Sequence, residues 1–256
     1  MLGVQTLAIG NHKGGVAKTT TTATIGAVMA RRGRRVLLID ADPQAGLTRL
    51  LGARYPQGLA DVIGLGAPGV AITRATMHLA PQLDLVPASR ELAACELAIT
   101  ARVAREGILS RALSLVSDAY DVCLIDCPPS LGLLAVNALA AAAGVIVPTR
   151  AAALDLGAVA DYLATVATIQ DAINPRLRLV GVLVTMATKT NAAVDAIDAV
   201  RAAGWPLLGV IGQSTAVAEA AALRQVITEY DPRNERAAEY ERTTTEIERW
   251  ISDATK

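Results

Sequence analysis

The segment from Asn11 to Thr20 constrains the fold of this chain more than any other, and it reads Asn-His-Lys-Gly-Gly-Val-Ala-Lys-Thr-Thr. It follows a short apolar run, Thr6 to Ile9, and precedes residues that favour a helix. Glycines let backbone N–H groups approach a polyphosphate, and the helix that follows directs the positive end of its dipole toward the anion. Lys18 would supply a positive charge and Thr19 a hydroxyl for Mg²⁺. The pattern predicts a strand, a phosphate-binding loop and a helix.

The loop departs from the usual pattern G-x-x-x-x-G-K-[ST] at both glycine positions, because His12 occupies the first and Ala17 the second. If Ala17 must adopt the left-handed conformation, its methyl group costs roughly 1 kcal/mol, which a loop can tolerate. A second lysine, Lys13, stands ahead of Lys18, although an ordinary phosphate loop has no use for it. The two lysines favour a specialised nucleotide loop over a simple glycine turn.

Length, charge and cysteine content narrow the class of protein. The 256 residues suffice for one sizeable α/β domain, and we expect a single domain over residues 1–256 because no segment has the composition of a linker. Three scattered cysteines form neither a disulfide framework nor a metal-ligand spacing, and no secretion signal precedes the loop, so we expect a cytoplasmic protein. The net charge is zero, so any DNA binding must come from a local patch.

Apolar runs alternate with helical patterns along the whole chain, which predicts a doubly wound, mostly parallel sheet with helices on both faces. The apolar stretch from Leu131 to Pro148 is interrupted by Asn137 and Gly144, so it fits a buried helix and strand better than a membrane span. The expected strands are Thr6–Gly10, Arg35–Ala41, Leu83–Pro87, Val122–Cys127, Gly144–Pro148, Leu177–Thr185 and Leu207–Ile211. The expected helices are Thr19–Arg31, Arg90–Ser117, Gly132–Ala143, Asp155–Ala172, Asn191–Ala203 and Ala237–Ala254, with a surface loop at Gly64–Gly69.

Carboxylates end two of the expected strands, at the edge where ligands bind in such sheets. Asp40 and Asp42 close the second strand and Asp126 closes the fourth, and Thr185 ends a later strand at the same edge. Asp126 is placed to stand behind a Mg²⁺ ion and Asp42 to hold an attacking water molecule. The prolines that follow, Pro128 and Pro129, would stiffen a loop that senses the γ-phosphate.

Three motifs, Lys13–Thr20, Asp40–Gln44 and Asp126–Gly132, together resemble the deviant-Walker-A ATPases of the ParA/Soj partition family. Weaker matches occur in order along nearly the whole chain, at Leu59–Ile63, Leu85–Ser89, Asn137–Leu139, Val147–Pro148, Leu183–Met186 and Tyr230–Arg233.

The resemblance implies roles for individual residues. Lys13 matches the signature lysine that reaches across an ATP-sandwich dimer, so Lys13, Lys18 and Asp42 are the expected catalytic residues. Thr19, Asp42 and Asp126 are the expected metal ligands. The expected nucleotide-binding residues are Lys13, Gly14, Gly15, Val16, Ala17, Lys18, Thr19, Thr20, Asp126, Pro128, Thr185 and Met186.

The resemblance also implies a function. Family members hydrolyse ATP slowly with Mg²⁺, form an ATP-dependent homodimer, bind double-stranded DNA without sequence preference and are stimulated by a ParB-type centromere-binding protein. They act in chromosome or plasmid partition and associate with the nucleoid. The chain has no N-terminal helix-turn-helix pattern, which argues against operator recognition, and one arginine expected to contact DNA is replaced in the segment Ile211–Ala216. The remaining DNA-contact candidates are Lys189, Arg201 and Arg224.

Two other functions remain open at this stage. A MinD-like protein would attach to membrane through a basic amphipathic C-terminal helix, but the tail from Glu235 to Lys256 is net acidic. A nucleotide-gated scaffold with little turnover is possible because Ala17 and the altered segment Gly212–Ser214 could weaken catalysis. The retained aspartates Asp42 and Asp126 argue against that reading.

Overall fold

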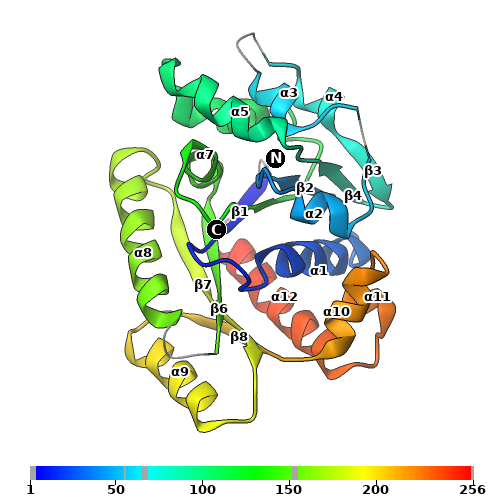
Figure 1. The fold of residues 1–256 in the computed structure, drawn as a ribbon, viewed down its shortest axis with the longest axis vertical. Coiled ribbons are helices and arrows are strands. Elements are labelled where there is room, and N and C mark those ends of the chain that lie inside the picture. Colours follow the sequence, from blue (N-terminus) through cyan, green and yellow to red (C-terminus); the bar gives the residue numbers. More distant parts are fainter. Residues whose placement is uncertain (1–3, 55, 65–68, 152–154, 255–256) are drawn as a thin grey trace.

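One sheet organises the computed structural model, which describes residues 4–54, 56–64, 69–151 and 155–254. Within this part of the chain eight strands lie in the order β3-β4-β2-β5-β1-β6-β7-β8, and all neighbours are parallel except β3 and β4 (Figure 1). Helices cover both faces, as the alternating sequence pattern predicts. The strands are β1 Gln5–Ile9, β2 Val36–Asp40, β3 Met77–Ala80, β4 Leu83–Val86, β5 Val122–Asp126, β6 Gly144–Arg150, β7 Arg178–Ala187 and β8 Leu207–Gly212.

The helices agree with the expected ones where the sequence has a long uninterrupted pattern. Those bounds are α1 Lys18–Arg31, α7 Leu133–Ala141, α8 Asp155–Ala172, α9 Asn191–Ala202 and α12 Glu235–Ala254. Short helices that the sequence did not indicate are α2 Gly46–Leu50, α3 Leu59–Ile63, α4 Ile72–Ala75, α10 Thr215–Ala222 and α11 Ile227–Tyr230. Of the expected surface loop, residues 65–68 lie outside the described part.

The single helix expected from Arg90 to Ser117 is wrong. The segment instead forms α5 Glu91–Ala98, the 3₁₀ turns η1 Ile99–Ala101 and η2 Arg105–Gly107, and α6 Ile108–Ser114. Arg102 is extended and donates a hydrogen bond to the Ile63 carbonyl oxygen at 2.6 Å, and Ala104 has a left-handed φ of 52°. This contact with a distant carbonyl accompanies a chain reversal that local helix propensity does not encode.

Two apolar layers enclose the sheet, and the central strands alternate between them. On β1, Ala8 faces the layer of α3, α5, α6, α7 and α8, while Leu7 and Ile9 face the layer of α1, α10, α11 and α12. Every residue of β2 and β5 is buried, as expected for strands covered on both faces. The stretch from Leu131 to Pro148 contributes α7 and part of β6, in agreement with the sequence analysis. No helix of the described residues combines the length and apolarity needed to cross a membrane.

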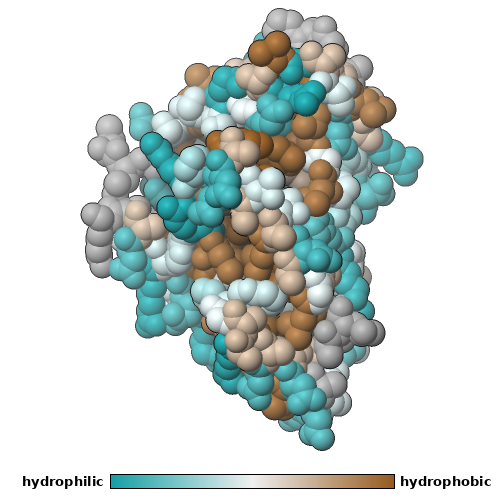
Figure 2. Space-filling model, turned by 90° about the vertical axis from the view of Figure 1, so that its left-hand side faces the viewer, coloured by the Kyte–Doolittle hydropathy of each residue, from teal (hydrophilic) through white to brown (hydrophobic). Residues whose placement is uncertain are grey.

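On the face that carries α8 and α9, hydrophilic residues border an apolar area near the middle (Figure 2). The outward positions of α8 include small residues, among them Ala160, Ala164 and Ala167. The large apolar side chains of α8, including Val159 and Ile169, are instead buried toward the sheet.

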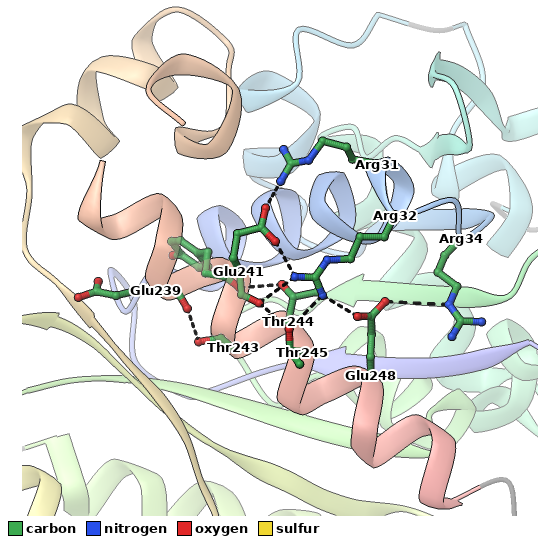
Figure 3. Close-up of polar contacts among 10 residues, drawn as sticks. Arg31, Arg32, Arg34, Glu239, Glu241, Thr243, Thr244, Thr245 and Glu248 are labelled. Atoms are coloured by element: carbon green, nitrogen blue, oxygen red, sulfur yellow. Dashed lines mark hydrogen bonds and ion pairs between the residues drawn. The ribbon is translucent and has the colours of Figure 1, made fainter. Parts of the chain in front are cut away.

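Arginines at and just after the end of α1 pair with glutamates of α12, and we call these contacts the clamp (Figure 3). The Arg32 guanidinium contacts Glu241 at 2.5 Å and Glu248 at 2.6 Å, and it also donates to Thr245 Oγ1 at 3.2 Å. Arg31 pairs with Glu241, and Arg34 lies 4.0 Å from Glu248. This cluster of arginine–glutamate pairs joins segments about 210 residues apart in sequence. It connects the helix that follows the phosphate loop to the last helix of the fold.

We expect Arg32→Ala to lower the free energy of unfolding by about 1 kcal/mol at low salt, because one guanidinium serves two carboxylates. The loss should shrink in 1 M NaCl, because salt screens such partly exposed pairs. Arg249→Ala is the matched control, since Arg249 is 69% exposed and pairs with Glu246 on its own helix, one turn away. Urea denaturation at both salt concentrations measures the effect, and equal losses for the two variants would contradict the clamp.

Candidate active site

The phosphate loop leaves the end of β1 and is fixed by its own side chains. Asn11 is buried, accepts a hydrogen bond from the Lys13 N–H at 3.0 Å and donates to the Pro148 carbonyl oxygen at 2.8 Å. The Lys18 ammonium donates to the Lys13 carbonyl oxygen at 2.9 Å, which closes the loop on itself. Burial lowers the pKa of Lys18, while the charge of Asp126 acts in the opposite direction. The loop is therefore already formed around the place where phosphates would lie.

Ala17 adopts the left-handed conformation that the sequence analysis considered, with φ 64° and ψ 28°. It precedes the first residue of α1 and offers no side-chain cap to that helix, so the first N–H groups are available to an anion. Gly15 is also left-handed, with φ 70°. Gly14 is exposed, and a Cβ atom placed there would meet nothing within 4 Å. The loop thus presents open backbone on its outer side.

Thr19 and Asp126 meet across the sheet edge. β1 pairs with β5 so that Ile9 lies beside Asp126, and Thr19 Oγ1 donates to Asp126 Oδ2 at 2.7 Å. The other carboxylate oxygen, Oδ1, is buried and has no hydrogen-bond partner among the described residues. A threonine hydroxyl beside a buried carboxylate with an unsatisfied oxygen is a donor set that suits Mg²⁺. The residues present therefore fit the metal that the sequence analysis expects.

The two aspartates after β2 have different surroundings. Asp40 is fully buried, and its Oδ2 accepts hydrogen bonds from the Thr48 N–H at 2.8 Å and hydroxyl at 2.7 Å. Asp42 is only partly buried, and its Oδ1 accepts the Gln44 N–H at 2.8 Å. Asp40 also accepts the Asp42 N–H at 3.2 Å. Asp40 is thus a structural support for the turn, whereas Asp42 lies where a carboxylate could hold water.

Tyr162 of α8 packs against the base of the loop. Its ring stacks edge-on against His12 with 5.0 Å between ring centroids. A Cβ on Gly10 would lie 1.8 Å from the Tyr162 hydroxyl oxygen, so a larger residue at this position would displace the Tyr162 ring. The sequence pattern gave no signal for this contact, because Tyr162 lies in a helix far from the loop in sequence.

A cavity of about 280 Å³ adjoins the loop on the side of β7 and β8. It is lined by Ala17 and Thr20 on the side of the phosphate loop, by the ends of β7 and β8, and by residues of the segment after β8 and of α10 and α12. Thr185, an expected nucleotide residue, is buried and donates to the Val16 carbonyl oxygen at 3.2 Å. Met186 is left-handed at φ 52° and lies on the cavity wall. The sequence analysis missed the other wall, which consists of Ile211, Gly212, Gln213, Ser214, Val217, Ala218, Ala221 and Tyr240.

The remaining expected residues lie in separate places. Pro128 is buried in the loop after β5. Lys189 is exposed at the turn before α9, whereas Arg201 lies at the other end of that helix and pairs with Asp198 at 3.2 Å. Arg224 lies after α10, where its side chain packs beside Gly52. The three DNA-contact candidates therefore do not form one patch on a single copy of the chain.

A larger cavity, about 720 Å³, lies at the opposite edge of the sheet. Gln5 and Thr6 at the start of β1, Arg176, Arg178 and Trp250 are among its lining residues. None of the phosphate-loop residues or the three aspartates lines it. We therefore assign the nucleotide site to the cavity beside the loop, although it is the smaller of the two.

Comparison with known proteins gives three kinds of match. A family model described as "AAA domain" matches residues 4–179. The sporulation initiation inhibitor protein Soj of Bacillus subtilis is 38% identical over 91% of this chain and 94% of its own length. The chromosome-partitioning ATPase Soj of Thermus thermophilus is 37% identical over 98% of both chains.

Solved structures agree with the fold. Cobyrinic acid a,c-diamide synthase from Mycobacterium smegmatis, solved with bound ADP and magnesium, is 35% identical, with a TM-score of 0.84 over 98% of this chain and 96% of its own. McdA of Cyanothece, solved as a complex of an aspartate-to-alanine variant with ATP, has a TM-score of 0.85 over 100% of this chain and 97% of its own. At 21% identity, McdA supports the fold alone.

Without Mg²⁺ and nucleotide, we expect the free energy of unfolding to fall as pH rises from about 4 to about 8. Burial raises the pKa of Asp126 to about 8 and that of Asp40 to about 6, so the folded chain retains protons that the unfolded chain releases in this window. Asp126→Asn should make the fall smaller, whereas Asp171→Asn, on the exposed side of α8, should not. Urea denaturation in EDTA across this range measures it, and an unchanged slope in Asp126→Asn would refute the assignment.

The sequence matches cover nearly the whole chain, and the matched region contains the phosphate loop, Thr19, Asp42 and Asp126. These residues converge at the carboxyl edge of one mostly parallel sheet. The chain therefore belongs to the ParA/Soj-type family of chromosome-partitioning ATPases.

Proposed function

We propose that this protein is a DNA-segregation ATPase whose ATP-bound form is a sandwich dimer that binds DNA without sequence preference. The observation that carries the proposal is the Thr19–Asp126 contact of 2.7 Å beside a loop with two lysines. The curated relatives that cover almost the whole chain are named as Soj proteins, one of them as a chromosome-partitioning ATPase. These relatives are 37–38% identical to this chain, and the Mycobacterium synthase structure is 35% identical. We therefore base the proposed function on the Soj relatives.

The cofactors are ATP and Mg²⁺. Lys18 and the N–H groups at the start of α1 would contact the phosphates. Thr19 and Asp126 would hold the metal, with Asp42 near it. The 280 Å³ cavity next to Ala17 is of a size and position to take the nucleobase. Bound Mg²⁺ would supply positive charge against the phosphates, and Asp42 would orient the attacking water. Thr185 and Met186 line the same cavity, which supports their proposed role in nucleotide binding.

The proposed dimer gives roles to two further loop residues, Lys13 and Gly14. Lys13 matches the signature lysine of the family, and its carbonyl oxygen accepts the Lys18 ammonium at 2.9 Å. Gly14 is exposed and leaves space at its Cβ position, which permits close approach of a second copy. Lys13 then serves the phosphates of the partner copy. Pairing would also bring the scattered cations Lys189, Arg201 and Arg224 of two chains onto a shared DNA surface, with a ParB-type protein stimulating hydrolysis at the nucleoid.

The MinD-like alternative is weakened by the packing of α12. Its apolar side, including Tyr240 and Ile247, is buried against α1 and β8, and Trp250 and Ile251 pack on the same layer. A helix that lies on a membrane needs this side exposed to lipid.

The scaffold alternative differs from the proposed function only in its turnover of ATP, so hydrolysis rates distinguish the two. A rate equal to that of Asp42→Ala, with and without DNA, would favour the scaffold.

We expect Lys13→Ala to abolish ATP-dependent dimerisation while retaining measurable ATP binding, because the lysine acts on the partner's nucleotide. Lys18→Ala is the comparison, since it removes the phosphate contact within one chain and should lose binding itself. Light scattering with Asp42→Ala as background keeps ATP intact during the measurement. A dimer unchanged by Lys13→Ala would contradict the sandwich.

If the dimer binds DNA through phosphates, its affinity should fall steeply with salt and be indifferent to sequence, with a response to ATP but not to ADP or to the nucleotide-free protein. Biolayer interferometry on two unrelated duplexes at 50 and 200 mM salt tests this. Salt-tolerant or sequence-selective binding, or binding without ATP, would overturn the DNA proposal and leave the ATPase assignment intact.

A further inference from the structure

The loop from Cys127 to Gly132 connects the metal-site residue Asp126 to α7, and it is fixed mainly at its two ends. At the start, the Cys127 N–H donates to the Ile9 carbonyl oxygen at 3.1 Å, and the Asp126 carbonyl oxygen accepts the Ala41 N–H at 3.0 Å. In between, Pro128 and Pro129 have no N–H group to donate. The position of the middle of the loop therefore depends on how its far end is held.

The far end is held by Glu96, a residue of α5. Gly132 precedes α7 and has no side chain to cap it, so the Leu134 N–H donates instead to Glu96 Oε1 at 3.1 Å. A Cβ on Gly132 would lie 1.9 Å from the same oxygen, which shows how closely the carboxylate seats against the loop. A carboxylate at the first turn also interacts favourably with the helix dipole.

The rest of α7 is anchored independently of Glu96. Asn137 is buried, accepts the Leu109 N–H at 3.2 Å and donates to the Arg105 carbonyl oxygen at 2.9 Å. Because this second anchor lies one turn further along, loss of Glu96 should release the start of α7 and the loop without releasing the whole helix. Glu96 itself is only partly buried, so its removal opens no core cavity.

We propose that Glu96 is a positioning residue for ATP hydrolysis: it holds the 127–132 loop, and through it Pro128, against the site of the γ-phosphate. The proposal rests on the ATPase assignment and on the γ-phosphate-sensing reading of this loop, and it does not depend on the dimer or on DNA. Since ADP lacks the γ-phosphate, loss of Glu96 should weaken the binding of ATP more than the binding of ADP. A residue that only supported the fold would affect both nucleotides alike.

The test compares Glu96→Ala, Glu96→Gln and Glu91→Ala, the last a matched control because Glu91 is an exposed glutamate on the same helix. We expect Glu96→Ala to lower kcat by about fivefold or more, in line with the loss of a helix cap, and to reduce the preference for ATP analogue over ADP with little change in ADP affinity. Glu96→Gln keeps an acceptor oxygen and should retain most of the kcat and most of the preference for the ATP analogue.

Three results would overturn the proposal. They are an unchanged kcat and nucleotide preference in Glu96→Ala, equal losses for ATP analogue and ADP together with a lowered Tm, and no recovery in Glu96→Gln. The ratio of the two affinities, measured with a fluorescent ADP and a nonhydrolysable ATP analogue, needs no turnover. If the wild-type protein hydrolysed no ATP, the ATPase assignment would fail, while the ratio would still report on Glu96.

Discussion

The parallel pairing of β1 with β5 is the constraint on which the site depends. It sets Ile9 beside Asp126, so the loop that leaves one strand and the carboxylate that ends the other meet at the same edge. The hydrogen bond between Thr19 and Asp126 joins the two segments directly. β2 continues the arrangement on the other side of β5, where Asp40 lies beside Asp126 and positions the turn that carries Asp42. Three separate segments thus reach one site because their strands are neighbours.

Burial at this edge gives the site its electrostatic character. Lys18, Asp40 and Asp126 are almost completely removed from solvent, and burial disfavours the charged form of each. A bound metal and a polyphosphate would compensate these charges in a way that the polypeptide alone does not. The architecture is therefore suited to a ligand that carries both signs of charge, as a magnesium nucleotide does.

Most of the fold and the centre of the site could be predicted from the sequence, because apolar runs and the loop motif are local signals. The elements and contacts that the sequence did not predict depend on partners far away in the chain. The break within residues 90–117 accompanies the bond from Arg102 to Ile63, and β3 is an edge strand that is specified by its antiparallel pairing with β4. The inward direction of Asp40 depends on Thr48, and the stacking of Tyr162 on His12 joins elements far apart in sequence. No periodicity in the chain encodes such contacts.

The clamp between α1 and α12 has a consequence for how this chain can be engineered. α1 has 14 residues, so it is a stiff rod of roughly 21 Å with the phosphate loop at one end and Arg31 and Arg32 at the other. Tyr240 of α12 also approaches Thr21 in the first turn of that rod, 3.4 Å between oxygens, and lines the cavity beside the loop. Truncations, affinity tags or fluorescent fusions that disturb α12 would therefore reach the nucleotide pocket through Tyr240.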